Sequence, residues 1–88
     1  MNVTLLVGQN IRNSRKRKGV KLEILADKLQ IDKSTLSKME TGRIGITIER
    51  VGKIAQALEI NFNDLIAVPL SAGGENAAKA EGDFADAN

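Results

Sequence analysis

The sequence predicts an all-α fold, with a compact five-helix domain over residues 1–68 and an acidic, Ala/Gly-rich tail over residues 69–88. Apolar residues recur every three or four positions in short runs, which places them on one face of a helix. Potential cap residues and glycines stand between these runs, where helices begin and end. The tail has almost nothing to bury, so we expect it to be disordered.

Residues 22–41, LEILADKLQIDKSTLSKMET, predict two short helices joined by a tight turn at Gln30. Each helix has one apolar stripe, and the small residue Ala26 stands where two steeply crossing helices come close. In the second helix, Leu36 and Met39 form the packed face. The opposite face carries short polar and basic side chains, a combination that suits the major groove of DNA: Lys33, Ser34, Ser37 and Lys38.

Cap signals place the remaining helices. The first begins after Asn2 or Thr4 and runs to about Lys18, where Gly19 supplies a left-handed C-terminal residue. The fourth begins after Thr47.

Finer expectations concern individual residues. The carboxylate of Asp32 is placed to cap the helix that follows it, and Asn61 with Asp64 resembles a capping arrangement for a fifth helix near residues 62–67. Gly52 lies inside the fourth helix, where we expect it to permit close approach of another element, for example a partner subunit.

The charge is unevenly distributed. Residues 1–68 hold 12 of the 13 Lys and Arg residues and 7 of the 11 Asp and Glu residues, a net charge of +5. Residues 69–88 have a net charge of −3, so the chain as a whole has +2. A basic domain with an acidic tail indicates a polyanionic partner for the domain only.

Composition excludes several classes of protein. The chain has no Cys, His, Tyr or Trp, which rules out disulfides and the usual zinc sites and removes most nucleophile and general-base arrangements. We therefore expect no enzyme activity, no metal, no cofactor and no small-molecule substrate. No apolar run is long enough to span a membrane, and we expect a cytoplasmic location.

Residues 7–66 resemble the lambda-repressor-like, Cro/Xre-type helix-turn-helix domain. That resemblance implies a five-helix DNA-binding fold with the helix-turn-helix at the second and third helices, and a role as a sequence-specific transcriptional regulator. The matching landmarks occur in order and at similar separations: Asn10 to Arg12, Arg15 to Gly19, Leu25-Ala26, Lys28-Leu29, Ser34 to Glu40, Gly42, Ile54 to Leu58, and Asn61 to Ile66.

The resemblance also implies the DNA contacts. Base edges would be read from the third helix by Lys33, Ser34, Ser37 and Lys38, although a second cap contact for Ser34 and a merely solvated position for Ser37 remain alternatives. Leu22 replaces a Gln that many relatives use to bind phosphate, so only its backbone amide could serve there. Contacts to the DNA backbone are expected from Lys21, Leu22, Thr35, Thr41 and Arg43.

Arg15 and Glu40 match a pair that forms an internal salt bridge in this family. The alternative is two exposed charges that contribute little to stability. We expect the salt bridge, because a free Glu40 would repel nearby phosphates.

The family's C-terminal helix often forms a two-fold dimer. The resemblance therefore implies a homodimer bound to double-stranded DNA with an inverted-repeat operator. A repressor is the expected regulator, since no activation surface is evident. The expected interface residues are Phe62, Leu65, Ile66 and Val68, with a position in the core as the alternative for each.

An alternative role is that of an antitoxin-type regulator. In that case the same fold binds its own operator while the tail binds a protein partner. Phe84, surrounded by Asp and Ala residues, is the side chain in the tail that could anchor such a contact. Copurification of a partner protein separates the two roles.

Overall fold

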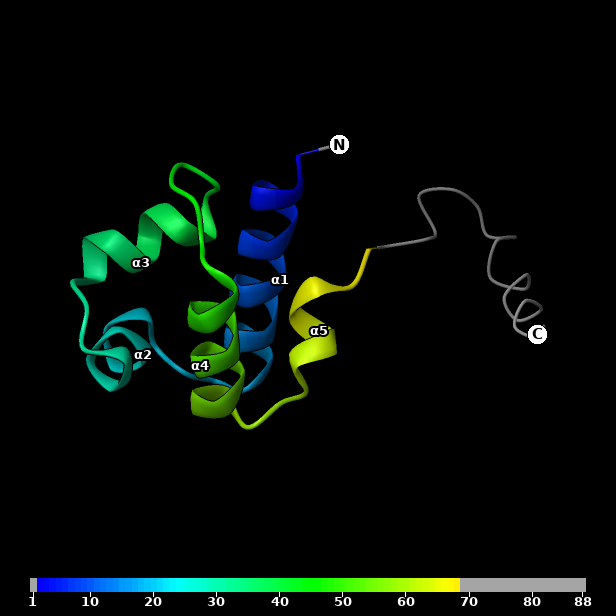
Figure 1. Ribbon diagram of the computed structural model, residues 1–88. Helices are drawn as coiled ribbons and strands as arrows, with labels where there is room; N and C mark the ends of the chain where they lie inside the picture. Colours follow the sequence, from blue (N-terminus) through cyan, green and yellow to red (C-terminus); the bar gives the residue numbers. More distant parts are fainter. Residues whose placement is uncertain (1, 69–88) are drawn as a thin grey trace.

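The computed structural model describes residues 2–68, which form five helices and no strand (Figure 1). The predicted tail, residues 69–88, lies outside the described residues. The helices within residues 2–68 are α1 (Val3–Arg17), α2 (Leu22–Leu29), α3 (Lys33–Glu40), α4 (Ile48–Leu58) and α5 (Phe62–Ile66). None of these helices has the length and apolar character needed to cross a membrane.

Two helices begin at side-chain caps that the sequence predicted. Asn2 is the N-cap of α1, and its side-chain oxygen accepts a hydrogen bond from the Leu5 amide at 3.0 Å. Thr47 is the N-cap of α4, and its hydroxyl accepts from the Arg50 amide at 3.0 Å. Each cap satisfies one of the amides that the first helical turn leaves without a backbone partner.

The capping predictions for α3 and α5 are wrong. Asp32 and Asn61 are the N-cap residues, but neither side chain caps its helix within the described part of the chain. These first turns have only backbone hydrogen bonds: the Leu36 amide donates to the Asp32 carbonyl at 3.1 Å, and the Asp64 amide donates to the Asn61 carbonyl at 3.0 Å. Both cap residues are exposed, so water can satisfy their side chains.

Gln30 ends α2 in the left-handed conformation, at φ 59°. A non-glycine residue adopts this conformation at a cost of about 1–2 kcal/mol. The turn is stabilised by the next residue, because the Ile31 amide donates to the Ala26 carbonyl at 3.0 Å and the Ile31 side chain packs against the core. The tight turn between α2 and α3 therefore forms without glycine.

The core takes one fully buried side chain from each helix. Ile11, Leu25, Leu36, Ile54 and Leu65 have no exposed surface. Helix α1 packs against α3, α4 and α5, with α3 and α5 on opposite sides of it in Figure 1, while α4 also contacts α2. The assignment of Leu65 to a dimer interface is therefore wrong, because this side chain is fully buried in the core of its own domain.

Asn10 attaches the short helix α5 to α1. Its side-chain amide donates to the carbonyls of Leu65 and Ala67, both at 2.9 Å. These carbonyls lie at the C-terminal end of α5, where a helix leaves acceptors without partners. A five-residue helix thus gains a fixed position from a side chain 55 residues earlier in the sequence.

The close helix approach occurs at Gly8 rather than at the predicted Gly52. A Cβ atom on Gly8 would overlap the Met39 carbonyl oxygen and lie 2.9 Å from that of Glu40, so α1 and α3 meet backbone to backbone. At Gly52 no atom of the described chain lies within 4 Å of the corresponding position. The prediction for Gly52 is wrong for contacts within the domain, because this glycine faces open space.

We expect Gly8→Ala and Gly52→Ala to have opposite effects on stability. Alanine at residue 52 should stabilise α4 by about 1 kcal/mol, the ordinary propensity difference within a helix. Alanine at residue 8 gains the same propensity but forces α3 away from α1, so we expect net destabilisation by about 1–3 kcal/mol. Urea unfolding of the two variants measures both, and a Gly8→Ala variant as stable as Gly52→Ala would contradict the close approach.

Candidate nucleic-acid interface

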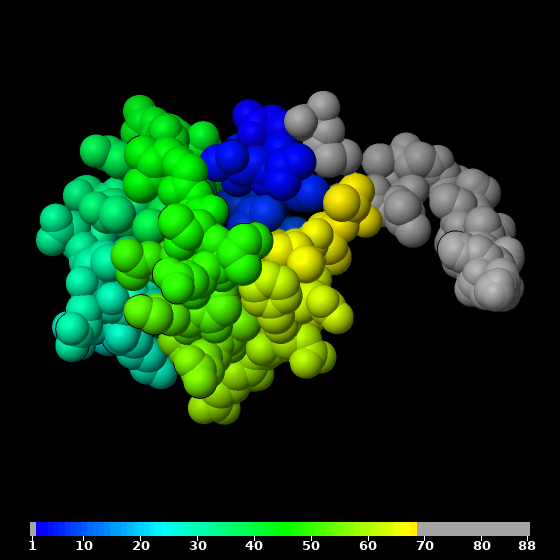
Figure 2. Space-filling view, viewed as in Figure 1, coloured from blue at the N-terminus to red at the C-terminus, as the bar shows by residue number. Residues whose placement is uncertain are grey.

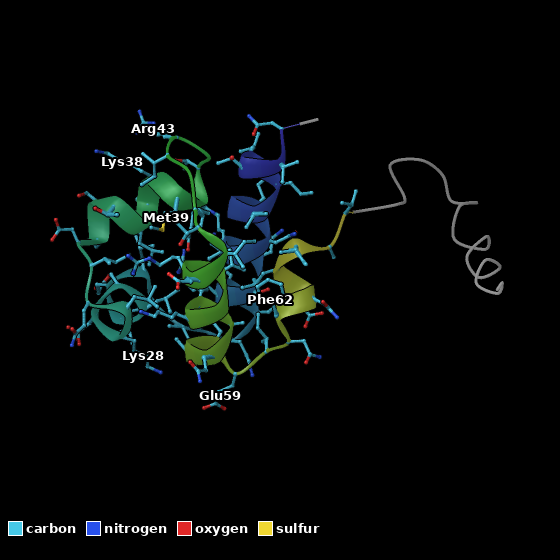
Figure 3. The ribbon with its side chains drawn as sticks, viewed as in Figure 1. Lys28, Lys38, Met39, Arg43, Glu59 and Phe62 are labelled. Carbon is cyan, nitrogen blue, oxygen red and sulfur yellow. The ribbon has the colours of Figure 1, made fainter. Side chains whose placement is uncertain are left out.

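Helix α3 has one face in the core and one face in solvent. Leu36 and Met39 are buried, and Figure 3 shows Met39 directed inward. Lys33, Ser34 and Lys38 are exposed and Ser37 is partly exposed. Positions 33, 34, 37 and 38 repeat at helical spacing, so the predicted base-reading side chains share one stripe along the helix.

The exposed stripe lies at the edge of the molecule. In Figure 3 the labelled side chains of Lys38 and Arg43 point outward from α3 and the loop after it. In the space-filling view, the segment from α3 into this loop forms an outer edge of the domain (Figure 2). A helix placed in this way is accessible from outside the domain.

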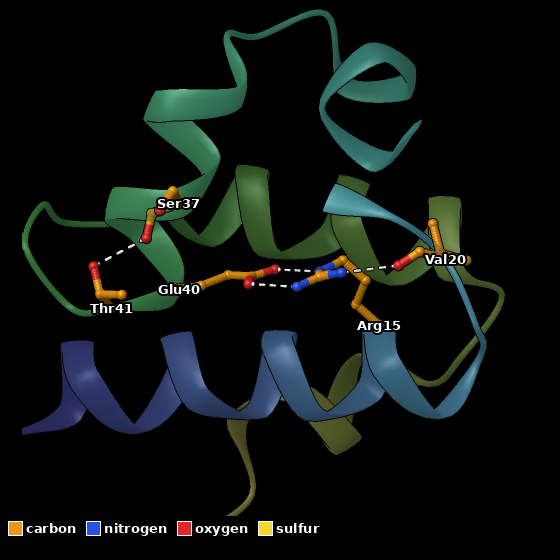
Figure 4. Close-up of polar contacts among 5 residues, drawn as sticks. All are labelled: Arg15, Val20, Ser37, Glu40 and Thr41. Atoms are coloured by element: carbon orange, nitrogen blue, oxygen red, sulfur yellow. Dashed lines mark hydrogen bonds and ion pairs between the residues drawn. The ribbon is translucent and has the colours of Figure 1, made fainter. Parts of the chain in front are cut away.

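A buried ion pair fixes the end of α3 on α1 (Figure 4). Arg15 Nε donates to Glu40 Oε2 at 2.8 Å, and its Nη2 donates to Oε1 at 3.1 Å. The two side chains are only 10% and 2% exposed. Two parallel hydrogen bonds of this kind restrict both distance and orientation between a guanidinium and a carboxylate.

The same guanidinium also holds the segment that enters α2. Its Nη1 donates to the Val20 carbonyl at 2.9 Å. Arg15 therefore contacts the last residue of α3 and the connection between α1 and α2, so that one side chain positions both helices of the helix-turn-helix (Figure 4).

Comparison with known proteins identifies the fold. Residues 11–65 match the helix-turn-helix family HTH_3. The chain belongs to this family of Cro/C1-type DNA-binding transcription regulators. No match was found among curated proteins.

Solved structures with the same fold include three regulators. The restriction-modification controller protein C.AhdI from Aeromonas hydrophila is 31% identical with a TM-score of 0.66, over 70% of this chain and 94% of that protein. The clp gene regulator ClgR from C. glutamicum is 28% identical with a TM-score of 0.70, over 72% and 82%. The hypothetical transcription factor NHTF from Neisseria is 27% identical with a TM-score of 0.71, over 80% of each chain.

The residues predicted to contact DNA phosphates differ in whether a side-chain or backbone donor is free to bind a phosphate. Lys21 and Arg43 are exposed. Leu22 packs partly against the core, so only its amide at the start of α2 remains as a donor. The Thr41 hydroxyl donates to the Ser37 carbonyl at 2.9 Å, which occupies its single hydrogen in this conformation.

The sequence predicted only part of an apolar patch on the domain: Ile66 and Val68 were expected at an interface, whereas Val3 and Ile48 were not. Within residues 2–68, four of the five exposed large hydrophobic side chains line one groove of about 180 Å³. They come from the start of α1, the start of α4 and the end of α5: Val3, Ile48, Ile66 and Val68, which are 39–70% exposed. This patch is hard to predict from the sequence, because its residues are isolated apolar positions in three separate segments of the chain.

A second hollow of about 500 Å³ lies between α2 and α4. Its lining residues include Leu29, Ala57 and the exposed Lys28 and Lys53. None of these residues belongs to the stripe on α3, so they provide control positions for tests of DNA binding.

We expect Glu40→Ala to destabilise the helix-turn-helix domain by about 3 kcal/mol or more, because it leaves the Arg15 guanidinium buried without its partner. For a domain of this size that corresponds to a fall in Tm of at least about 12 °C by calorimetry. Glu49→Ala, at an exposed position of α4, is the matched control and should change Tm little.

The double variant Arg15→Met/Glu40→Leu should recover much of that loss, since it removes both charges and fills the space with apolar atoms. An unchanged Tm for Glu40→Ala would show that the ion pair contributes nothing to the fold.

Proposed function

We propose that this protein is a sequence-specific repressor that binds an inverted-repeat operator as a homodimer, with α3 in the major groove. The observation that carries the proposal is the polar stripe on α3, presented by a helix whose inner face is buried and whose end is held by the Arg15–Glu40 pair. A rigid helix with an exposed polar face can align several side chains with base edges at once.

The side chains of the stripe define what this helix can read. Lys33 and Lys38 can donate to guanine O6 and N7, and the hydroxyls of Ser34 and Ser37 can donate or accept, directly or through water. Since these groups read few positions unambiguously, sequence-dependent DNA shape is proposed to supply part of the specificity.

Phosphate contacts are proposed from both ends of the stripe. Lys21 and Arg43 bring exposed positive charge, and the free amides at the start of α2 can hold a phosphate oxygen through Leu22. Thr35 and Thr41 are proposed to contact the backbone as well, for Thr41 once its hydroxyl turns away from the Ser37 carbonyl. These contacts would orient the domain without reading sequence.

The apolar groove is the proposed dimer interface. Ile66 and Val68, predicted from the sequence, line it together with Val3, Ile46 and Ile48, whereas Phe62 packs partly against the core. Ile46 follows the loop after α3, so pairing two grooves brings the C-terminal ends of both α3 helices toward the two-fold axis. Two recognition helices about 34 Å apart would then face one side of a duplex.

Repression is proposed to occur by occupancy. A dimer bound across an operator blocks polymerase without needing any further contact, cofactor or catalytic group. The proposed partner is double-stranded DNA, and the proposed location is therefore the cytoplasm.

Selection of bound duplexes from a random library tests the proposal. We expect an enriched inverted repeat that the protein binds about 10³-fold or more tightly than a scrambled duplex. Weak and equal binding to both duplexes, lost as the salt concentration rises, would contradict sequence-specific regulation.

Alanine variants separate base reading from phosphate binding. Lys33→Ala and Ser34→Ala should weaken operator binding by about 1–3 kcal/mol each and relax the selected sequence. Arg43→Ala should weaken operator and scramble alike and reduce the salt slope by about 1. Lys53→Ala, on α4 and outside the stripe, is the matched control, and an equal loss at this residue would show only non-specific attraction.

A charged substitution tests the dimer interface. Ile48→Glu should convert the dimer to a monomer in sedimentation experiments without DNA, because it places a carboxylate in the apolar groove. Ile24→Glu changes an exposed isoleucine in the first turn of α2 and should leave the dimer intact. If both variants and the unchanged protein sediment alike, this groove is not the interface.

A further inference from the structure

The second half of α1 and the connection after it carry the densest run of positive charge in the chain. Residues 12–21 contain six Lys and Arg residues, of which all but Arg15 are exposed, and residues 2–22 contain no Asp or Glu. The proposed DNA contacts use only the last of these cations, Lys21. Because a charged run can serve hydration alone, its place relative to the candidate interface decides what it can bind.

The loop after α3 rests on the first half of α1. A Cβ atom on Gly42 would lie 2.9 Å from the Leu5 Cα, so the two backbones are in close contact. Arg43, which is proposed to hold a phosphate, is the next residue and is exposed. One proposed phosphate contact is therefore attached to α1 near Leu5.

The connection into α2 is attached farther along α1. The Arg15 guanidinium donates to the Val20 carbonyl at 2.9 Å, and Lys21, which is also proposed to hold a phosphate, follows directly. In Figure 4, Val20 and Thr41 lie toward opposite ends of α1. Ten residues separate residue 5 from residue 15, about 15 Å along the helix axis. Helix α1 therefore spans the distance between the two proposed phosphate contacts.

Arg12 and Lys16 lie on the side of α1 that runs between these two contacts. Leu5, Gln9, Arg12 and Lys16 are spaced by four, three and four residues, so they form one stripe along the helix. This stripe adjoins the face that meets α3, which Gly8 marks by its contact with the α3 backbone. Both cations are exposed. The stripe therefore extends positive charge along the edge of the candidate interface.

Little negative charge opposes this stripe. Within residues 2–68, neither Arg12 nor Lys16 has a carboxylate within ion-pair distance. The acidic residue of α3 is Glu40, which is buried and paired with Arg15. Asp32 precedes the other end of α3, away from the end that packs on α1. Both cations are thus free to bind an anion from solvent.

We infer that Arg12 and Lys16 bind two further phosphates of the same duplex, beside those held at Lys21 and Arg43. This inference rests on the proposed function for the identity of the partner as double-stranded DNA. A row of phosphates matches a row of cations in charge, and each contact releases a condensed counterion. The contacts strengthen binding to any sequence and read no base.

The double variant Arg12→Gln/Lys16→Gln tests the inference through the salt dependence of duplex binding. The logarithm of the affinity should fall less steeply with the logarithm of the salt concentration, with a slope smaller by about 2. Between about 50 and about 200 mM salt, the variant should lose about tenfold less affinity than the unchanged protein. Operator and scrambled duplex should show the same change.

Arg17→Gln is the matched control on the same helix. Residue 17 is turned by about 100° around the helix axis from residue 16, away from α3. The Arg17 Nη2 donates to the Ser14 hydroxyl at 3.2 Å, on the opposite side of the buried face of α1. The slope for this variant should match that of the unchanged protein. A reduction of about 1 for Arg17→Gln would show general attraction to a basic domain and would overturn the assignment.

A charge-preserving variant separates charge from folding. Arg12→Lys/Lys16→Arg should keep the original slope, and calorimetry should give the same Tm for all variants, since both side chains are exposed. An unchanged slope for Arg12→Gln/Lys16→Gln would overturn the inference, and so would a reduced slope for the charge-preserving variant.

Neutral methylphosphonate groups locate the contacts on the selected operator. Replacing single phosphates should identify two positions that weaken binding of the unchanged protein but not of Arg12→Gln/Lys16→Gln. If every such position weakens both proteins equally, the inference fails. If the protein binds all duplexes equally, the proposed sequence-specific function fails while the slopes still decide the role of α1. Binding to no duplex overturns both.

Discussion

The contact between Arg15 and Glu40 determines where α3 lies, and the proposed DNA contacts all depend on that position. Two hydrogen bonds from one guanidinium fix the last residue of α3, and a third fixes the entry to α2 through the Val20 carbonyl. Gly8 complements the pair, because the absence of a side chain lets α1 meet the backbone of α3 directly. Distance is thus set by a glycine and orientation by a charged pair, which lie about two turns apart on the same face of α1.

An ion pair at this point has a consequence that an apolar contact would lack. Apolar residues of similar volume would hold two helices together at least as well, since burying charges is itself unfavourable. The pair adds orientation, and it keeps the Glu40 carboxylate away from solvent at the end of a helix that carries Lys33 and Lys38. Glu40 therefore does not present a free carboxylate to the phosphates that this face is proposed to meet.

The features that the sequence predicted are those with local causes. The apolar spacing and the caps at Asn2 and Thr47 depend on residues within one or two turns, and the structure has them as expected. The Arg15–Glu40 contact was expected only through the resemblance, because 25 residues separate the partners. Gly8 and Gly52 show what local sequence cannot predict. Both are glycines within helices, and only the three-dimensional fold shows that Gly8 meets the backbone of α3 while Gly52 faces open space. Leu65 was misplaced for the same reason, since a short terminal helix presents its apolar residues to the core or to a partner with the same spacing.

The apolar groove and the cationic face are close together because the loop after α3 contributes to both. In this loop Arg43 is exposed and Ile46 lines the groove. A partner domain seated in the groove would therefore restrict the loop, and with it the end of α3. Duplex binding and dimer formation should be linked, since each would order a segment that the other also needs. The physical coupling between duplex and partner domain thus passes through residues 43–48, a short connection that is not itself proposed to contact DNA bases.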